Sequence, residues 1–212
     1  MKLLILSDVH YPNSKNDAFD IIKKENPDNL MLLGDTIDNS KSNKTIVELY
    51  EIFFDKVKKL IPINSVYAIV GDNDYSFSDE KKTLIFLNKL NLANKNKFLI
   101  KKGNMVFFHG NLETSLRQES IGKSILKTSK SFKLDILAIL FLSLLIRTKF
   151  KISFSKYLFF GHLHYLGKIN NKTYVCGTLS RDKIIYEKER SYGYIIIEHN
   201  NFIFKNFKIV KL

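Results

Sequence analysis

Aspartate and histidine residues recur in five short motifs that could bind metal ions. Each motif follows a short apolar run, and the motifs are Asp8-Val9-His10, Gly34-Asp35-Thr36-Ile37-Asp38-Asn39, Gly71-Asp72-Asn73-Asp74, His109-Gly110 and Gly161-His162-Leu163-His164. Four of the five histidines of the chain lie in these motifs. Because carboxylate and imidazole ligands without a thiolate suit manganese, iron or zinc, the motifs predict a site for a metal of that kind.

The number of candidate ligands predicts a site for two ions. The candidates are Asp8, His10, Asp35, Asp72, His109, His162 and His164. Pairs of ions about 3.5–4 Å apart are typical of hydrolytic sites, where they generate hydroxide at neutral pH and hold a phosphoryl oxygen. Asp35 is the expected bridging ligand. Each motif alone is equally compatible with a turn or a structural histidine, and only the whole set favours a metal site.

The apolar runs before the motifs predict the strands of an α/β domain. Strands are expected at Lys2–Ser7, Asn29–Leu33, Ser65–Val70, Phe98–Ile100, Met105–Phe108 and Tyr157–Phe160, and helices at Asp17–Glu25, Thr45–Leu60 and Lys81–Leu90. The end of the chain is expected to form a β-meander from Lys172–Cys176, Tyr192–Glu198 and Phe202–Ile209. In open α/β sheets ligands bind beyond the carboxyl ends of the strands, so the five motifs are expected to converge on one place.

Composition limits the class of protein. Of 212 residues, 45% are hydrophobic and 26% are charged, which excludes collagen-like, coiled-coil and wholly disordered chains. The single cysteine, Cys176, cannot form an internal disulfide, and the apolar start is too short for a signal peptide. We therefore expect one domain over residues 1–212 and a cytoplasmic location, with a place at the inner face of the membrane left open.

The net charge of +13 is distributed unevenly along the chain. Residues 1–110 carry 16 Lys/Arg and 14 Asp/Glu, whereas residues 111–212 carry 18 and 7. An AT-rich genome that favours lysine codons is one explanation. The other is an anionic partner of the second half, which would be a phosphorylated substrate, a nucleic acid or a membrane surface.

Residues 111–156 form a basic, partly apolar segment that is expected to be a helical lid or insertion. Within it, Leu134–Ile146 has only Asp135 and Ser143 among apolar residues. As a helix this stretch would be about 20 Å long, too short to cross a bilayer. A helix buried in the lid, a homodimer contact and an apolar surface for a lipid chain or membrane remain open. Basic residues beside it suit peripheral contact with an anionic membrane through 134–151.

The order of the five motifs resembles the calcineurin-like metallophosphoesterases over about residues 1–110 and 157–180. The resemblance implies a four-layer α/β/β/α sandwich with a dinuclear centre, most commonly of manganese or of iron and zinc. We expect Mn²⁺, with Fe or Zn as alternatives. Carried over by position, the ligands of the first metal are Asp8, His10, Asp35 and His164. Those of the second metal are Asp35, Asp72, His109 and His162.

The third motif departs from the family pattern at two positions. Asp72 replaces an asparagine ligand, and Asn73 replaces a histidine that assists the leaving group in many members. Neutral asparagine cannot act as a general acid near pH 7. Asp74 fits the acidic position of the family and is expected behind the ligands. Catalytic or orienting roles are further expected for Asp38, Asn39 and Asn73 beside the metals and for His109, which would stabilise developing charge.

The expected function is hydrolysis of a phosphodiester or pyrophosphate by a metal-bridging hydroxide. The alternatives are a non-catalytic scaffold on the same fold and a nuclease that acts on single-stranded nucleic acid. The position of the helical insertion resembles that of the UDP-diacylglucosamine pyrophosphohydrolases, which implies a phosphorylated small-molecule or lipid-linked substrate. Arg117, with Glu113 and Gln118 nearby, would then contact a phosphate or sugar.

Overall fold

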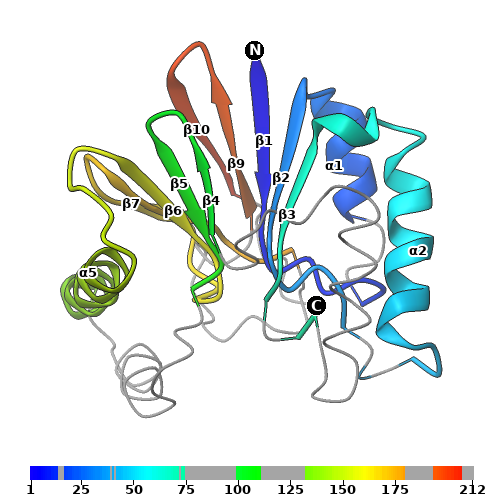
Figure 1. Cartoon of the computed structure of the whole chain (residues 1–212), viewed down its shortest axis with the longest axis horizontal. Helices are drawn as coiled ribbons and strands as arrows, with labels where there is room; N and C mark the ends of the chain where they lie inside the picture. Colours follow the sequence, from blue (N-terminus) through cyan, green and yellow to red (C-terminus); the bar gives the residue numbers. More distant parts are fainter. Residues whose placement is uncertain are drawn as a thin grey trace.

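Two five-stranded β-sheets face each other, and helices cover their outer sides (Figure 1). The computed structural model describes residues 1–13, 17–38, 40, 42–71, 73–74, 99–110, 132–179 and 193–206. The expected helix at Lys81–Leu90, the segment 111–131 and residues Asn39, Asp72 and Arg117 lie outside this part. The four layers confirm the α/β/β/α sandwich predicted above.

The first sheet has the strand order β10-β9-β1-β2-β3. Its strands are β1 (Lys2–Leu6), β2 (Asn29–Leu33), β3 (Val66–Ile69), β9 (Gly193–Glu198) and β10 (Asn201–Asn206). β1, β2 and β3 are parallel, and β9 runs antiparallel to both β1 and β10. The helices α1 (Asp17–Glu25) and α2 (Ile46–Val57) make the parallel connections, and the 3₁₀ turn η1 (Ile63–Ser65) leads into β3.

The second sheet has the strand order β4-β5-β6-β8-β7. Its strands are β4 (Leu99–Lys102), β5 (Met105–Phe108), β6 (Tyr157–Phe160), β7 (Gly167–Asn170) and β8 (Thr173–Val175). The three inner strands are parallel, and the two edge strands are antiparallel to their neighbours. β4 and β5 form a hairpin that turns at Gly103 and Asn104. The carboxyl ends of β1, β2, β3, β5 and β6 lie at the lower end of both sheets in Figure 1.

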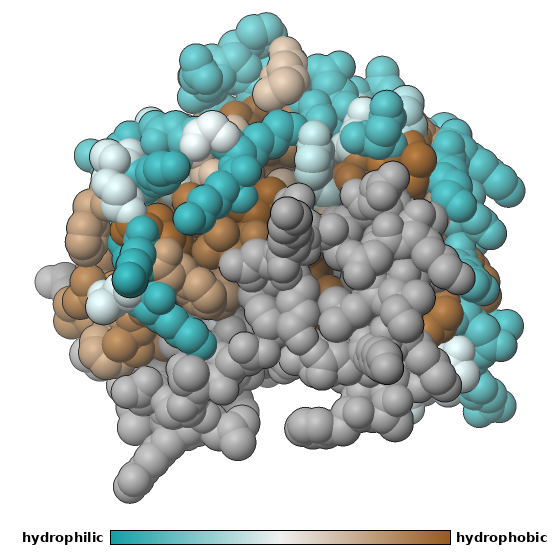
Figure 2. Space-filling model, in the orientation of Figure 1, coloured by the Kyte–Doolittle hydropathy of each residue, from teal (hydrophilic) through white to brown (hydrophobic). Residues whose placement is uncertain are grey.

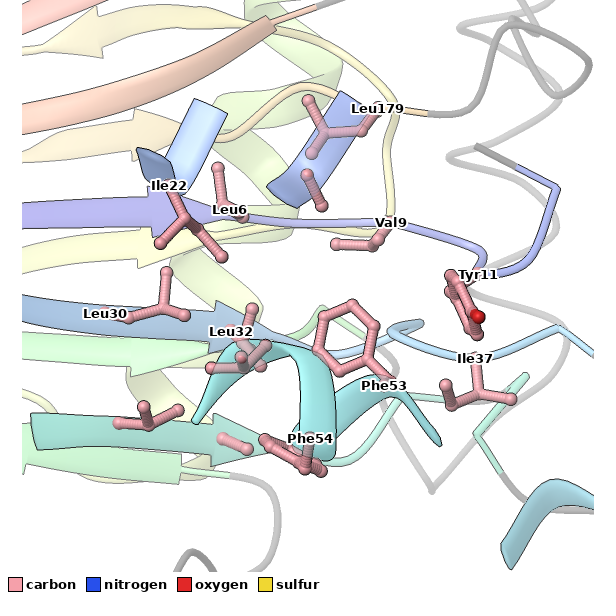
Figure 3. Packing of buried hydrophobic residues seen from close by; sticks show 14 of the residues in the cluster. Leu6, Val9, Tyr11, Ile22, Leu30, Leu32, Ile37, Phe53, Phe54 and Leu179 are labelled. Atoms are coloured by element: carbon pink, nitrogen blue, oxygen red, sulfur yellow. The ribbon is translucent and has the colours of Figure 1, made fainter. Parts of the chain in front are cut away.

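Alternating side chains along each central strand explain why the layers stack. In β1, Leu3 and Ile5 pack toward the second sheet, while Leu4 and Leu6 pack toward the helices. Both faces are apolar because both are buried, as expected for parallel strands. Figure 3 shows Leu6 in the helix-side cluster together with Leu32 and Phe53.

Helix α2 forms where the sequence carries both a start signal and an apolar face. The Thr45 side chain accepts from the Glu48 amide, and the Glu48 side chain accepts from the Thr45 amide. This capping box satisfies two backbone donors at the helix start. The buried residues of α2 recur at helical spacing and are Ile46, Leu49, Tyr50, Phe53, Phe54 and Val57.

Helix α5 (Phe132–Lys149) covers the outer face of the second sheet. Ile139, Leu142 and Ile146 belong to the cluster that this helix forms with the sheet. The predicted helix at 134–146 is thus confirmed as part of a longer one. Among the described residues, no helix combines the length and apolar character that crossing a bilayer requires.

The predicted β-meander at the end of the chain is wrong. β8 lies in the second sheet beside β7, whereas β9 and β10 close the edge of the first sheet. β7 was not predicted, because the edge strand Gly167–Asn170 alternates between half-buried and exposed positions and carries no apolar run. The consecutive strands β8 and β9 therefore belong to different sheets. This pairing depends on contacts between distant parts of the chain, which local sequence patterns do not specify.

Candidate metal centre

The loops after the parallel strands bring the predicted motifs to one place. Asp8 follows β1, Asp35 follows β2, His109 follows β5 and His162 follows β6. Backbone hydrogen bonds tie these loops together: the His10 amide donates to the Asp35 carbonyl at 2.9 Å. The Gly161 amide donates to the His109 carbonyl at 2.8 Å. Neighbouring loops within each sheet are thus fixed to one another.

Five site residues hold a backbone conformation that is unfavourable for residues with a side chain. Their φ angles are 50° at Asp8, 52° at His10, 48° at Asp35, 64° at His162 and 49° at His164. The left-handed region costs a non-glycine residue about 1–2 kcal/mol. Such strain concentrates at functional sites, where the surrounding structure maintains it. Here it turns the side chains at the strand ends inward.

The inward side chains form two groups, each with three donors. One group consists of Asp8, His10 and His164, and the other consists of Asp35, His109 and His162. Within each group one donor atom per residue lies within 4.8 Å of the others, and all six residues are buried. The two groups contain the residues that the family resemblance assigned to the two metals, except that Asp35 is grouped with His109 and His162 alone and that Asp72 lies outside the described residues.

Asp35 faces both groups. Its Oδ2 atom lies 3.9 Å from Nε2 of His10, and its Oδ1 atom lies 3.4 Å from Nε2 of His109. Asn73 also contacts this carboxylate: its amide nitrogen donates to Oδ1 at 2.8 Å, and its side-chain Nδ2 donates to Oδ2 at 2.5 Å. The two oxygens of one buried carboxylate are therefore directed toward different imidazole groups.

Backbone contacts fix the ring of His109. Its Nδ1 atom lies 2.6 Å from the carbonyl oxygen of Leu33, which can only accept a hydrogen bond. Nδ1 therefore carries the proton, and Nε2 of the neutral ring carries the lone pair that a metal needs. Gly34 makes this contact sterically feasible, because a Cβ at that position would lie 2.5 Å from Nδ1 of His109.

Asp8 is held by neighbours from its own loop and from the loop after β6. Ser7 donates its hydroxyl hydrogen bond to Oδ2, and the His162 amide donates to the same atom at 2.9 Å. The other oxygen lies 3.2 Å from Nε2 of His164. Burial acts to raise the pKa of Asp8, but the attraction to His164 and the other histidines outweighs it and holds the pKa well below its ordinary value.

Two further aspartates lie behind the ligand groups. Oδ2 of Asp38 lies 3.7 Å from Nδ1 of His10, and its Oδ1 accepts from the Ser40 amide at 3.0 Å. Asp74 accepts from the backbone amides of Ile37 and Gly71, each at 2.8 Å, and so links the loops after β2 and β3. Burial and the nearby Asp35 carboxylate raise the pKa of Asp74 to about 7.

The residues of the two groups fit a pair of divalent cations. Buried carboxylates and imidazoles are costly unless they are paired or coordinate metals, and Asp8 and Asp35 are both buried. The donors are nitrogen and oxygen atoms without sulfur, which suits manganese, iron or zinc. Asp38 behind His10 and the Leu33 carbonyl behind His109 supply the outer contacts that orient metal-binding rings.

Sequence reasoning missed several supports of the site. Ser7 and Thr178 hold Asp8, the latter by donating its hydroxyl hydrogen bond to the Asp8 carbonyl at 2.9 Å. Gly71 and Gly161 leave room for Asp35 and Asp8, since an added Cβ would collide with these side chains or with Ser7. A glycine stands in four of the five motifs, and this was the available signal, because close packing at a ligand explains its position.

A family model and three solved structures are similar to this chain. The family model described as calcineurin-like phosphoesterase matches residues 1–200. The chain is similar in structure to TT1561 of Thermus thermophilus, with a TM-score of 0.50 and 11% identity over 97% of this chain and 98% of that one. YfcE, a phosphoesterase from E. coli, has a TM-score of 0.46 and 14% identity over 94% of this chain and 89% of that one. A predicted phosphoesterase from Streptococcus pneumoniae has a TM-score of 0.45 and 12% identity over 98% of this chain and 88% of that one. No curated protein sequence matches.

Proposed function

Since the chain belongs to the calcineurin-like phosphoesterase family and is thus a metal-dependent phosphoesterase, we propose that it hydrolyses phosphodiester or phosphoanhydride bonds with two divalent ions. Manganese is the first candidate for these ions, and iron or zinc would fit the same donors. The substrates we expect are nucleotide-type or lipid-linked phosphates. When bound, such ions supply a nucleophile at neutral pH and neutralise charge on the phosphoryl group.

The position of Asp35 is the observation that carries the proposal. Its two carboxylate oxygens lie 3.9 Å and 3.4 Å from imidazole nitrogens of different ligand groups. A carboxylate in this position can bind one ion through each oxygen. A site for a single ion would not need a second set of buried histidines, since three donors and a substrate already complete a coordination shell.

The other site residues would hold the ligands in place. Asp38 lies behind His10, and the Leu33 carbonyl fixes the tautomer of His109. Asp74 connects the loops that carry Asp35 and Asn73. All of these contacts join residues of the protein itself, and preorganisation of this kind is a main source of catalysis in polar sites.

Asn73 limits the leaving groups that the enzyme can expel. Its side chain lies against Asp35, at the place where many family members carry a histidine. A neutral amide does not donate a proton to a departing alkoxide near pH 7. The proposed substrates are therefore those whose leaving group departs without protonation, such as a phosphoanhydride or an aryl phosphodiester.

A comparison of leaving groups tests this proposal. With Mn²⁺ present, wild-type enzyme should hydrolyse bis-(para-nitrophenyl) phosphate and a nucleoside diphosphate-linked anhydride faster than an alkyl phosphomonoester. Asn73→His should raise kcat for poor leaving groups more than for good ones, by a factor within the ~10²–10⁴ that general acids contribute. Asn104→His, in the exposed turn between β4 and β5, is the matched control. A wild-type preference for alkyl monoesters would contradict the proposal.

A further inference from the structure

Helix α5 exposes apolar side chains on the face that it turns away from the sheet. Leu137, Phe141 and Leu144 are 60%, 52% and 48% exposed. Their spacing of four and three residues places them in one row along the helix. Ile139, Leu142 and Ile146 on the opposite face are buried against the second sheet. The exposed row of apolar side chains therefore does not contribute to the packing of α5 on the sheet.

The end of α5 and the turn after it extend this surface with an aromatic and two basic residues. Phe154 is 68% exposed, and Lys149 and Lys151 are exposed beside it in sequence. We define the α5 surface as these three residues and the row of Leu137, Phe141 and Leu144. Figure 2 shows hydrophobic residues at the left of the molecule, over α5, with hydrophilic side chains next to them.

The buried side chain of Arg147 holds this turn. Its guanidinium donates to the carbonyl oxygens of Ser153, Lys156 and Lys172 at 2.8, 3.1 and 2.9 Å. The same group lies 5.4 Å from the ring centroid of Phe154. The turn is thus tied both to the helix end and to the β7–β8 hairpin. Because its backbone is already held, Phe154 loses little conformational entropy when it contacts a partner.

The charge along α5 and the strands that it covers is predominantly positive. Residues 132–179 contain seven Lys/Arg and one acidic residue, Asp135. They comprise α5, β6, β7 and β8. A second copy of the chain in a two-fold dimer would place the same patch against itself, and so lysine against lysine. An anionic partner with an apolar interior avoids that repulsion.

We propose that the α5 surface docks on the headgroup region of an anionic lipid bilayer. Apolar side chains on one helix face enter the boundary between headgroups and acyl chains, and basic residues near them attract anionic lipids. Leu137, Phe141, Leu144 and Phe154 supply the first contribution. Lys149 and Lys151 supply the second. The proposal concerns binding alone and does not depend on which phosphate bond the enzyme cleaves.

Cosedimentation of the full-length protein with vesicles tests the proposal. Binding is expected with equal parts of phosphatidylcholine and phosphatidylglycerol and not with phosphatidylcholine alone. It should weaken between about 0.1 M and 1 M salt, where the screening length falls from about 10 Å to about 3 Å. Equal binding to both vesicle types would overturn the proposal.

Paired variants separate the apolar from the basic contribution. Phe141→Ser should weaken partitioning by about tenfold. Lys149→Gln with Lys151→Gln should weaken it by about 30-fold on anionic vesicles. The controls are Ile203→Ser on β10, where the side chain is 37% exposed, and Lys58→Gln with Lys59→Gln after α2, and both should bind like wild type.

Two outcomes would overturn the assignment of this surface to a lipid. One is wild-type vesicle binding by both Phe141→Ser and Leu137→Ser, with unchanged thermal unfolding to show that each variant is folded. The other is a dimer by sedimentation analysis that Phe141→Ser dissociates, without vesicle binding by the wild-type protein. The second result would assign the surface to another copy of the chain.

Discussion

Replacing Gly34 with alanine tests how the turn after β2 positions His109. Gly34 has a φ of +84°, and a Cβ there would lie 2.5 Å from Nδ1 of His109. The backbone conformation costs an alanine about 1–2 kcal/mol. Displacing the ring leaves the Leu33 carbonyl without its buried partner, which costs about 1–3 kcal/mol more. Gly34→Ala should therefore lower the free energy of unfolding by about 2–5 kcal/mol.

Gly103→Ala is the control for the backbone contribution. Gly103 has a φ of +59° in the turn between β4 and β5, and nothing lies within 4 Å of an added Cβ. In this variant the free energy of unfolding should fall only by the cost of the left-handed conformation, about 1–2 kcal/mol. Urea unfolding of metal-free protein measures both losses.

The same pair of variants separates stability from metal binding. Displacing His109 in Gly34→Ala should weaken the second ion by about 10–100-fold, as loss of a contact that orients a ligand does. Calorimetric titration with Mn²⁺ measures this, and Gly103→Ala should titrate like wild type. Equal losses of stability in both variants, together with wild-type affinity in Gly34→Ala, would refute the steric account of the site.

Three more predictions concern the ligand supports, pH and metal removal. Asp38→Asn keeps the shape of the residue that faces His10 and should weaken Mn²⁺ binding by about 10–100-fold in the same titration. Unchanged affinity would mean that Asp38 does not support metal binding. Burial acts to raise the pKa of Glu25, but hydrogen bonds from Lys2 and Tyr194 outweigh it and lower the pKa. The stability that Glu25 gives is thus present above about pH 4.5 and lost as pH falls below it, so wild type and Glu25→Gln should differ in urea unfolding at neutral pH and converge in acid. Chelation with EDTA should lower the free energy of unfolding by about 2.7 kcal/mol for each bound ion, relative to protein at Mn²⁺ about 100 times Kd, and an unchanged value would mean that no ion binds the folded state.

The sequence allowed prediction of the ligand groups because their signals are local. Each Asp or His motif follows a short apolar run, and parallel strands in one sheet end at the same edge. Asp8 and Asp35 after β1 and β2, and His109 and His162 after β5 and β6, lie where this rule places them. The helix of residues 46–57 was equally predictable, since its capping box and its apolar spacing are both visible in the sequence.

Features that depend on long-range contacts were not predictable in the same way. The assignment of β8 and β9 to different sheets follows from pairing across the fold, which strand patterns do not specify. The hydrogen bond between Asn73 and Asp35 and the one between His109 and the Leu33 carbonyl join different loops. The glycines in the motifs were the only feature of the sequence that indicated such close packing.

The metal content of wild type and Asp35→Ala tests the central claim most directly. Both proteins would be loaded with Mn²⁺, separated from free ion by gel filtration and analysed by elemental mass spectrometry. We predict two ions per wild-type chain, and fewer than two with no turnover in Asp35→Ala, because each oxygen of Asp35 faces a different ligand group. Two tightly bound ions in Asp35→Ala, or a single ion in the wild type, would contradict the bridging carboxylate.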